Sequence, residues 1–152
     1  MIKIICVGKV KDKHLKALID DYLERINHYH KTEIIEVKDE ANNLDEKTIL
    51  DKEGLRVLEK IDKDDYVITM DLHGKSIDSL SLADKLDKVF INNSKLTFVI
   101  GGSLGLSDKI RQRSNELIKL SDLTFLHQMT RLILLEQIYR CFKINNHETY
   151  HK

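Results

Sequence analysis

A cluster of glycines is the part of this sequence that most clearly indicates a binding site. Gly101, Gly102 and Gly105 follow an unbroken apolar run, Leu96–Ile100, and precede Ser107, a residue type that caps helices. A turn between a strand and a helix needs one or two glycines, so the excess indicates that something approaches the backbone closely. Ligands bind at the carboxyl ends of central strands in doubly wound sheets. A tight turn alone explains the glycines about equally well, and both interpretations stay open.

Two familiar phosphate-binding patterns do not fit this loop. A dinucleotide fingerprint read from Gly101 needs glycine where Ser103 and Leu106 stand. A phosphate loop ends in Gly-Lys-Ser/Thr, and no such run follows the glycines. The run that begins at Gly74 and ends at Ser76 has the right letters, but no glycine stands five residues before it.

Two further segments lie at the ends of predicted strands. One runs from Met70 to Lys75 (MDLHGK), and the other runs from Leu120 to Phe125 (LSDLTF). If these two segments and the glycine loop lie at one edge of a sheet, they form the walls of a pocket for a nucleotide-sized ligand.

A possible metal motif stands at the end of the chain. His147 to His151 spell H-E-x-x-H, the pattern of zinc metalloproteases. That chemistry needs a buried helix, a third protein ligand and an open position for water. Here the motif follows Asn145-Asn146, and no residues remain for the usual downstream ligand. Chance is a sufficient explanation, and we expect no metal site.

Short apolar runs alternate with amphipathic patterns along the whole chain. The predicted strands are Ile2–Val7, Thr32–Val37, Tyr66–Met70, Leu96–Ile100 and Leu123–Phe125. The predicted helices are Leu15–Tyr29, Leu50–Ile61, Leu82–Phe90, a helix that follows Ser107 and carries Ile110, Leu117 and Ile118, and Arg131–Ile144. This alternation predicts one α/β domain over residues 1–152, with a mainly parallel sheet and helices on both faces.

Charge and composition restrict the functional classes. The formal net charge is +0, from 25 basic and 25 acidic side chains, which argues against a bulk electrostatic binder of nucleic acid. Residues 39–65 are mainly acidic and residues 109–152 mainly basic, so a polyanion would meet the C-terminal third; a mixed solvated surface also explains this pattern. The sequence offers no disulfide framework, signal peptide or membrane-spanning run, and we expect a cytoplasmic protein without membrane attachment.

Several segments together resemble the RlmH family of SPOUT-type methyltransferases. They are the opening IKIICVGKVK, DKEG at 51–54, TMDLHGK at 69–75, VIGGSLGL at 99–106, SDLTFLHQMTRLILLEQIYRCFKI at 121–144 and the terminal TYHK. The resemblance covers essentially the whole chain. It implies an α/β fold whose C-terminal part forms a trefoil knot, an obligate homodimer, and S-adenosylmethionine as methyl donor. It also implies that the methyl group goes to N3 of a pseudouridine in 23S ribosomal RNA.

The resemblance also assigns cofactor contacts. They fall on Met70, on Gly101 and on the stretch from Leu120 to Phe125, which comprises Leu120, Ser121, Asp122, Leu123, Thr124 and Phe125. Family members commonly have leucine at position 70 and proline at position 126. A proline would stiffen the loop before the last helix, so Leu126 bears on the rigidity of that loop and on cofactor affinity.

The reaction needs a group that removes the proton from N3, or a cation that favours the anion, and it needs no metal. We expect His151 to act as the base or as a proton relay, with Tyr150 positioning the uracil ring. Both lie in a tail that can fold over a pocket, in the same subunit or in its partner. Arg131 and His127 stand four residues apart at the start of the last helix, where they can contact RNA phosphate or the substrate base. Packing within the helix is the alternative for Arg131.

The last predicted helix is apolar on nearly all sides, which indicates that it is buried. We expect it to form much of a homodimer interface, because one small subunit cannot easily cover Leu132, Leu134, Leu135, Ile138, Tyr139 and Phe142. On the same helix, Arg140 can pair with Glu136 one turn earlier.

Net neutrality predicts weak binding to naked RNA, because nonspecific affinity comes mainly from basic contacts with phosphates. We therefore expect the substrate to be 23S rRNA within the ribosome or the large subunit. Two alternatives remain. One is a catalytically inert RNA- or ribosome-binding paralogue, which only Leu126 favours. The other is a flavodoxin-like or Rossmann-like binder of another nucleotide.

Overall fold

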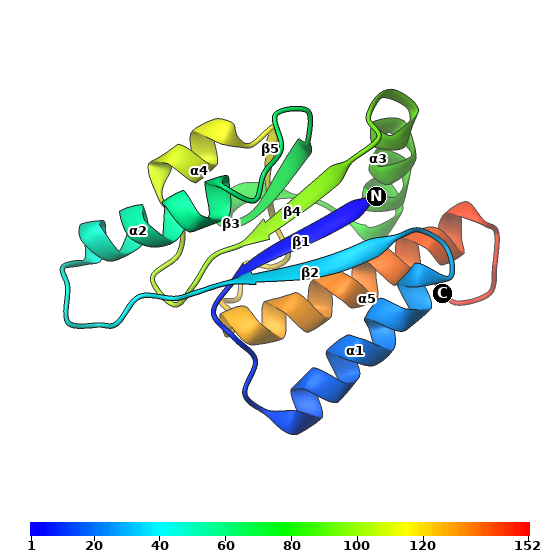
Figure 1. The fold of residues 1–152 in the computed structure, drawn as a ribbon. Helices are drawn as coiled ribbons and strands as arrows, with labels where there is room; N and C mark the ends of the chain where they lie inside the picture. Colours follow the sequence, from blue (N-terminus) through cyan, green and yellow to red (C-terminus); the bar gives the residue numbers. More distant parts are fainter.

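The structure is a computed structural model that describes residues 1–152, and its centre is a five-stranded sheet (Figure 1). The strands are β1 (Ile2–Val7), β2 (Thr32–Val37), β3 (Tyr66–Ser76), β4 (Leu96–Ile100) and β5 (Glu116–Lys119). The helices are α1 (Lys13–Asn27), α2 (Glu46–Leu58), α3 (Ser79–Asn92), α4 (Asp108–Arg113) and α5 (His127–Asn145). The strand order is β2-β1-β4-β3-β5, and all neighbours are parallel. The predicted fold class is confirmed.

Of the three inner strands, β1 and β4 are buried along their whole length. Their register places Ile4 of β1 opposite Phe98 of β4, which in turn lies opposite Ile68 of β3. A parallel strand covered on both faces needs few polar residues, and both strands are mainly apolar in the sequence. The exception in β1 is Lys3, whose buried ammonium group pairs with Asp65.

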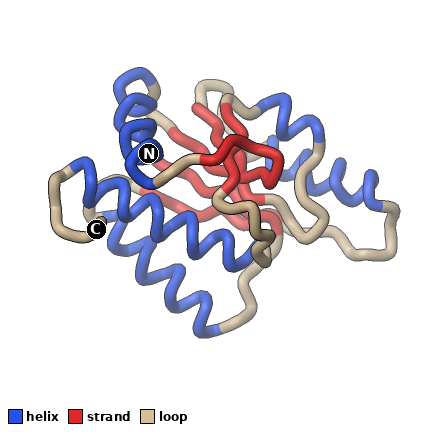
Figure 2. Tube along the Cα trace, turned by 180° about the vertical axis from the view of Figure 1, so that it is seen from behind, coloured by secondary structure: helices blue, strands red, loops and turns tan.

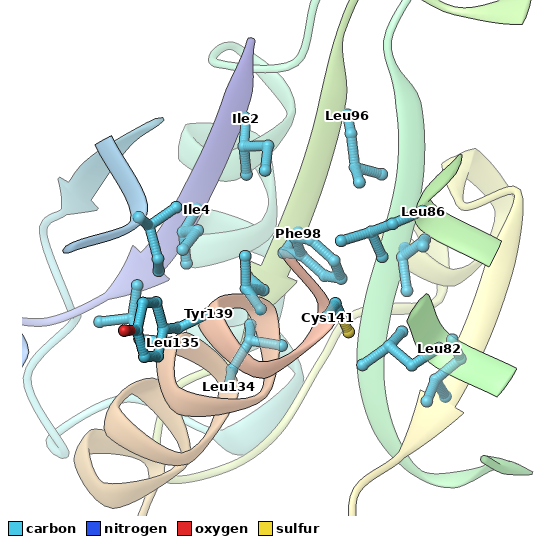
Figure 3. Packing of buried hydrophobic residues seen from close by; sticks show 14 of the residues in the cluster. Ile2, Ile4, Leu82, Leu86, Leu96, Phe98, Leu134, Leu135, Tyr139 and Cys141 are labelled. Atoms are coloured by element: carbon cyan, nitrogen blue, oxygen red, sulfur yellow. The ribbon is translucent and has the colours of Figure 1, made fainter. Parts of the chain in front are cut away.

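Helices α1, α3 and α5 cover one face of the sheet, and α2 and α4 cover the other (Figures 1 and 2). The larger core lies on the three-helix side, where Leu86 of α3 and Leu134 and Leu135 of α5 meet Phe98 of β4 (Figure 3). A smaller core around Val57 of α2 lies on the other side. No helix combines the length and apolar character that crossing a membrane requires.

The helix predicted after Ser107 is shorter than expected. Helix α4 ends at Arg113, and Leu117 and Ile118, which were assigned to it, belong to strand β5. The Ser114 hydroxyl forms a 2.7 Å hydrogen bond with the Thr69 hydroxyl of β3, and the Asn115 N–H donates to the Val67 carbonyl. These contacts take the chain out of the helix and onto the edge of β3. A helical spacing of apolar residues does not reveal such long-range contacts.

Two other predictions, one of a strand and one of the start of a helix, were also wrong. Leu123–Phe125 is a loop and not a strand, and Leu123 is 71% exposed. The Leu123 N–H donates to the Ser121 hydroxyl, a local turn contact that replaces strand pairing. The last helix begins at His127 rather than Arg131.

Strand β3 continues past the predicted end at Met70. It makes an excursion and then pairs with β5 again, so that Met70 and Lys75 both lie opposite Ile118. The residues between them form an extra loop at the edge of the sheet. This loop is one wall of the site described below.

Four of the six α5 residues that we expected to need cover from a second subunit are buried within one chain, and the other two stay half-buried. Leu134, Leu135 and Ile138 are 0% exposed and Tyr139 is 9% exposed within one chain, because α1 and α3 pack on either side of α5 (Figure 2). Burial of these four residues is therefore no argument for a dimer.

The closest approach between β3 and β5 requires a glycine. A Cβ atom on Gly74 would lie 2.6 Å from the backbone N of Ile118 and 2.6 Å from the carbonyl carbon of Leu117. Both are backbone atoms of a paired strand and cannot move aside cheaply. We predict that Gly74→Ala lowers the free energy of unfolding by about 1–3 kcal/mol, measured by urea denaturation. Lys75→Ala at the exposed neighbouring position is the control; equal stability of the two variants would contradict the prediction.

Candidate active site

Three connections from distant parts of the chain meet at the carboxyl edge of β3, β4 and β5. They enclose a cavity of about 630 Å³, together with the first turn of α5. All of the predicted cofactor positions except one line this cavity, namely Met70, Gly101, Leu120, Ser121, Leu123, Thr124 and Phe125. The convergence expected for the three segments is therefore present, and the volume is within the usual range for a small-molecule site.

Asp122 is the exception. Its side chain is 88% exposed and forms an ion pair with Lys119 on the outside of the loop. In this arrangement the carboxylate does not face the cavity. Its backbone still belongs to the loop that forms the wall.

The loop after β4 folds back on itself. Gly102 and Gly105 form an antiparallel bridge, and the Gly105 N–H donates to the Gly102 carbonyl over 3.1 Å. A Cβ on Gly101 would lie 2.4 Å from the Gly105 carbonyl oxygen. The close approach that the glycines indicated is thus made by the loop's own backbone. All three glycines line the cavity, so that at these positions no side chain takes up space in it.

The excursion of β3 between Met70 and Lys75 is fixed by an ion pair that local sequence patterns did not reveal. Arg111 of α4 donates from Nε to Asp71 over 2.7 Å and from Nη1 to the Leu106 carbonyl. Burial alone would raise the pKa of Asp71, but Arg111 and the His73 N–H, which donates to the same carboxylate, hold that pKa below its usual value. The charged pair ties two walls of the cavity together. Their separation of 40 residues explains why no local spacing pointed to it.

His127 closes the cavity on the side of β1. A Cβ on Gly8 would lie 3.8 Å from its Nε2 atom, and Asp39 lies equally close to Gly8. Burial lowers the pKa of His127, and the nearby charge of Arg131 lowers it further. The ring is therefore neutral at physiological pH, when it can both accept and donate hydrogen bonds.

Arg131 does not occupy the position expected for an RNA or substrate contact. Its side chain is 2% exposed, and its guanidinium donates to Glu36 over 2.7 Å and to the Gly8 carbonyl over 3.2 Å. Both partners lie at the ends of β1 and β2. The alternative interpretation, packing inside the protein, describes the observed geometry, and Arg131 fixes the first turn of α5 against the sheet.

The tail residues are far from this cavity within one chain. The Tyr150 ring packs 5.0 Å from the Tyr139 ring, and its hydroxyl donates to Glu136 over 3.0 Å. The Nη1 atom of Arg140 lies 3.2 Å from Nδ1 of His151. Arg140 also pairs with Glu136, as the helical spacing predicted. Along α5, Arg140 stands about 20 Å from His127, so the tail lies at the opposite end of the helix (Figure 1).

The H-E-x-x-H run does not adopt the geometry of a zinc site. Helix α5 ends at Asn145, before the run begins, and His147 has a φ of 56°. Glu148 pairs with Lys143 and accepts a hydrogen bond from Tyr29. The structure contains no group of three or more His, Cys, Asp or Glu side chains that could hold a metal ion.

The leucine at position 126 adopts a backbone conformation that proline also adopts. Its φ is −55° and its ψ is 131°, and its side chain is 61% exposed. The loop therefore follows the path that a proline would favour. This geometry weakens the argument that Leu126 marks an inert relative.

Comparisons with known proteins match nearly the whole chain to one family. A family described as "Predicted SPOUT methyltransferase" matches residues 1–151. The chain is 49% identical to the "Ribosomal RNA large subunit methyltransferase H" of Clostridium botulinum (strain Alaska E43 / Type E3), with 99% of both proteins covered. The protein of the same name from Bacillus cytotoxicus is 48% identical with the same coverage.

A solved structure shares the fold at low sequence identity. It is that of a probable methylase family protein from Haemophilus influenzae Rd KW20, with a TM-score of 0.55 and 15% identity. The match covers 99% of this chain and 70% of the other. At this identity the likeness supports the fold alone.

The buried position of Arg131 leads to a stability prediction. Arg131→Ala leaves Glu36 and the Gly8 carbonyl without their partner, and we expect a loss of about 2–4 kcal/mol in the free energy of unfolding. This is below the range for fully buried pairs, because the Glu36 side chain is 35% exposed. Urea denaturation measures the loss. The control is Arg56→Ala, which breaks a more exposed pair with Glu40 and should cost about 1 kcal/mol or less. Similar losses in the two variants would contradict the assignment.

Proposed function

The chain belongs to the RlmH family of SPOUT methyltransferases, S-adenosylmethionine-dependent enzymes of ribosomal RNA, and we propose that it methylates N3 of a pseudouridine in 23S rRNA. Membership of this family implies the α/β-knot fold. The observation that best supports the proposal is one cavity built by the excursion of β3 and by the connections that follow β4 and β5.

The residues of the cavity fit S-adenosylmethionine. Met70, Ile118 and Phe125 offer apolar surface suited to the adenine ring. The folded glycine loop presents main-chain groups without side chains in front of them. Thr130 and Ser121 add hydroxyl groups that can bond to the ribose or the amino acid part. We propose that these residues hold the methyl donor and that the glycine loop forms the wall against which it packs.

Bound S-adenosylmethionine supplies a methyl group that its sulfonium makes electrophilic. The protein has to bring N3 of the base into line with that methyl group and to move the N3 proton. We propose that His151 moves this proton, as base or relay, while Tyr150 positions the uracil ring. Arg140 lies at Nδ1 of His151, and Nε2 has no protein partner. The nitrogen that reaches the substrate is therefore Nε2.

The tail has to reach the cavity of another subunit if it takes part in the reaction, because about 20 Å of α5 separate the two within one chain. We propose that the active form is a homodimer in which each tail serves the partner's cavity. The dimer is supported by an apolar rim around the cavity. Its exposed members are Leu72, Leu104, Leu123, Leu126 and Met129, with exposed fractions of 39–71%.

Such a rim is unusual for a surface that faces only water. Its residues come from three connections and from the first turn of α5, and the four leucines line the cavity. A second copy of the chain that covers the rim would bury it and would narrow the access to the methyl donor. The substrate nucleotide would then enter between the two subunits.

Assembled ribosomal particles are the proposed substrate form. The formal net charge of +0 gives the protein little nonspecific affinity for naked RNA. Recognition then depends on a folded surface that brings a particular nucleotide to the cavity.

The central test has two parts. Isothermal titration should show that S-adenosylmethionine binds with a stoichiometry of one per subunit or one per dimer. Incubation with the labelled donor and ribosomes from cells that lack the enzyme should then add one methyl group to a pseudouridine, identified by mass spectrometry of the 23S rRNA. We expect much faster transfer to assembled particles than to extracted RNA. Binding without transfer would support an inert ribosome-binding protein instead.

The trans arrangement of the tail predicts complementation between two inactive variants. His151→Ala should lower the single-turnover rate by about 10²–10⁴-fold without loss of cofactor binding, the usual range for removing an acid or base. Gly101→Ala should prevent cofactor binding, because its Cβ meets the Gly105 carbonyl. Mixed dimers of the two variants contain one intact cavity served by one intact tail, and activity should return on mixing. Two inactive variants that stay inactive in proven mixed dimers would contradict the arrangement, as would a stable monomer in light scattering.

A further inference from the structure

The connection from β1 to α1 carries basic side chains that the proposed chemistry does not use. Lys9, Lys11 and Lys13 lie within five residues, and all three are exposed. None of them takes part in an ion pair. In a chain of zero formal net charge, three free cations this close together form a local positive surface.

The acidic groups around this connection are already engaged. Asp12 caps α1 by accepting a hydrogen bond from the Leu15 N–H, and Asp20 pairs with Lys16. Glu36 pairs with Arg131. Asp39, near Gly8, is the remaining carboxylate close to the turn. Residues 9–13 hold three lysines and one carboxylate, Asp12, so the segment keeps a net positive charge for an external partner.

The same connection is held in place beside the cavity. Arg131 donates to the Gly8 carbonyl, Gln128 donates to the Lys9 carbonyl over 3.3 Å, and the Val10 N–H donates to Glu36 over 3.2 Å. The first turn of α5 provides two of these contacts, and that turn also carries His127 into the cavity. In Figure 1 the blue segment leaves β1, passes the start of α5 and then enters α1.

We propose that Lys9, Lys11 and Lys13 form a phosphate-binding surface for the ribosomal RNA strand whose nucleotide enters the cavity. This inference rests on the proposed function and adds a contact surface to it. Lysine ammonium groups bind phosphate as point charges and read no sequence, which suits a surface that holds the backbone while the cavity selects the base. The hydrogen bonds to the turn hold the backbone that carries Lys9 and Lys11 beside the first turns of α5, next to the proposed cofactor cavity. The lysines thereby compensate locally for the missing overall positive charge.

The test compares two triple variants with the same change in charge. K9A/K11A/K13A removes the proposed surface. K47A/K52A/K63A removes three other exposed and unpaired lysines, two on α2 and one before β3. Each variant is assayed for S-adenosylmethionine binding by calorimetry and for methylation of large subunits over a range of subunit concentrations. Thermal unfolding checks that both variants are folded.

We expect the first variant to bind S-adenosylmethionine normally and to lose about 10–100-fold in kcat/KM, mainly through KM. Its binding to large subunits should also depend less on salt, with a log–log slope smaller by about 2, since each phosphate contact to a single strand contributes about 0.7. The control should behave like the unaltered protein. Substitution of the same three lysines by arginine should retain binding, because the charges remain.

Equal losses in the two alanine variants, or no loss in either, would overturn the proposal. The result can be separated from failure of the proposed function. If the unaltered protein does not methylate large subunits, sedimentation binding at several salt concentrations still compares the same variants. If it methylates them and K9A/K11A/K13A does so equally well, the function stands and the lysine surface is wrong.

Discussion

The last crossing of the chain is the constraint on which the site depends. After β5 at the edge of the sheet, the chain runs past the carboxyl ends of β3 and β4 and begins α5 next to Gly8 at the end of β1. Arg131 fixes the end of this crossing, because its buried guanidinium bonds to Gly8 and Glu36. A loop stretched between two fixed ends, β5 and Arg131, has little freedom to leave the cavity that it covers. The conformational entropy of this wall is therefore lost when the protein folds, and it does not have to be lost again when a ligand binds.

The opposite wall is shaped by how closely β3 and β5 approach each other. The excursion of β3 before it pairs with β5 again is possible because Gly74 lies against the backbone of β5. The ion pair between Asp71 and Arg111 then joins this excursion to α4 and to the end of the glycine loop. Each wall is thus attached to a different part of the core, and the walls share contacts. Coupling of this kind favours a cavity that is formed in the absence of ligand, which suits a reaction whose rate depends on alignment.

Much of this arrangement could be predicted from the sequence, for identifiable reasons. The apolar runs at Tyr66–Met70 and Leu96–Ile100 predicted the central strands, because strands buried on both faces need few polar residues. The glycine loop was located because excess glycine has a steric meaning. The resemblance to a family, and not periodicity, supplied the cofactor positions. The transition at Ser114 and Asn115 could not be predicted, because their partners lie on β3, more than 40 residues away. The burial of Arg131 depends on Glu36 and Gly8, which are still further away in sequence.

The neutral overall charge and the local lysine surface belong to one physical argument. A strongly basic protein binds any exposed phosphate backbone and is therefore often bound at nonspecific sites. A neutral protein relies instead on a small number of phosphate contacts that lie near its active site. The pairing pattern of the chain follows this principle. Most acidic groups near the cavity are held by cations of the same subunit, as in Asp71 with Arg111 and Glu36 with Arg131. Lys9 and Lys11, by contrast, are unpaired and lie on the turn that Arg131 anchors, and Lys13 follows at the start of α1. One buried arginine thus ends the crossing that closes the cavity and also fixes the position of the charges that would hold its substrate.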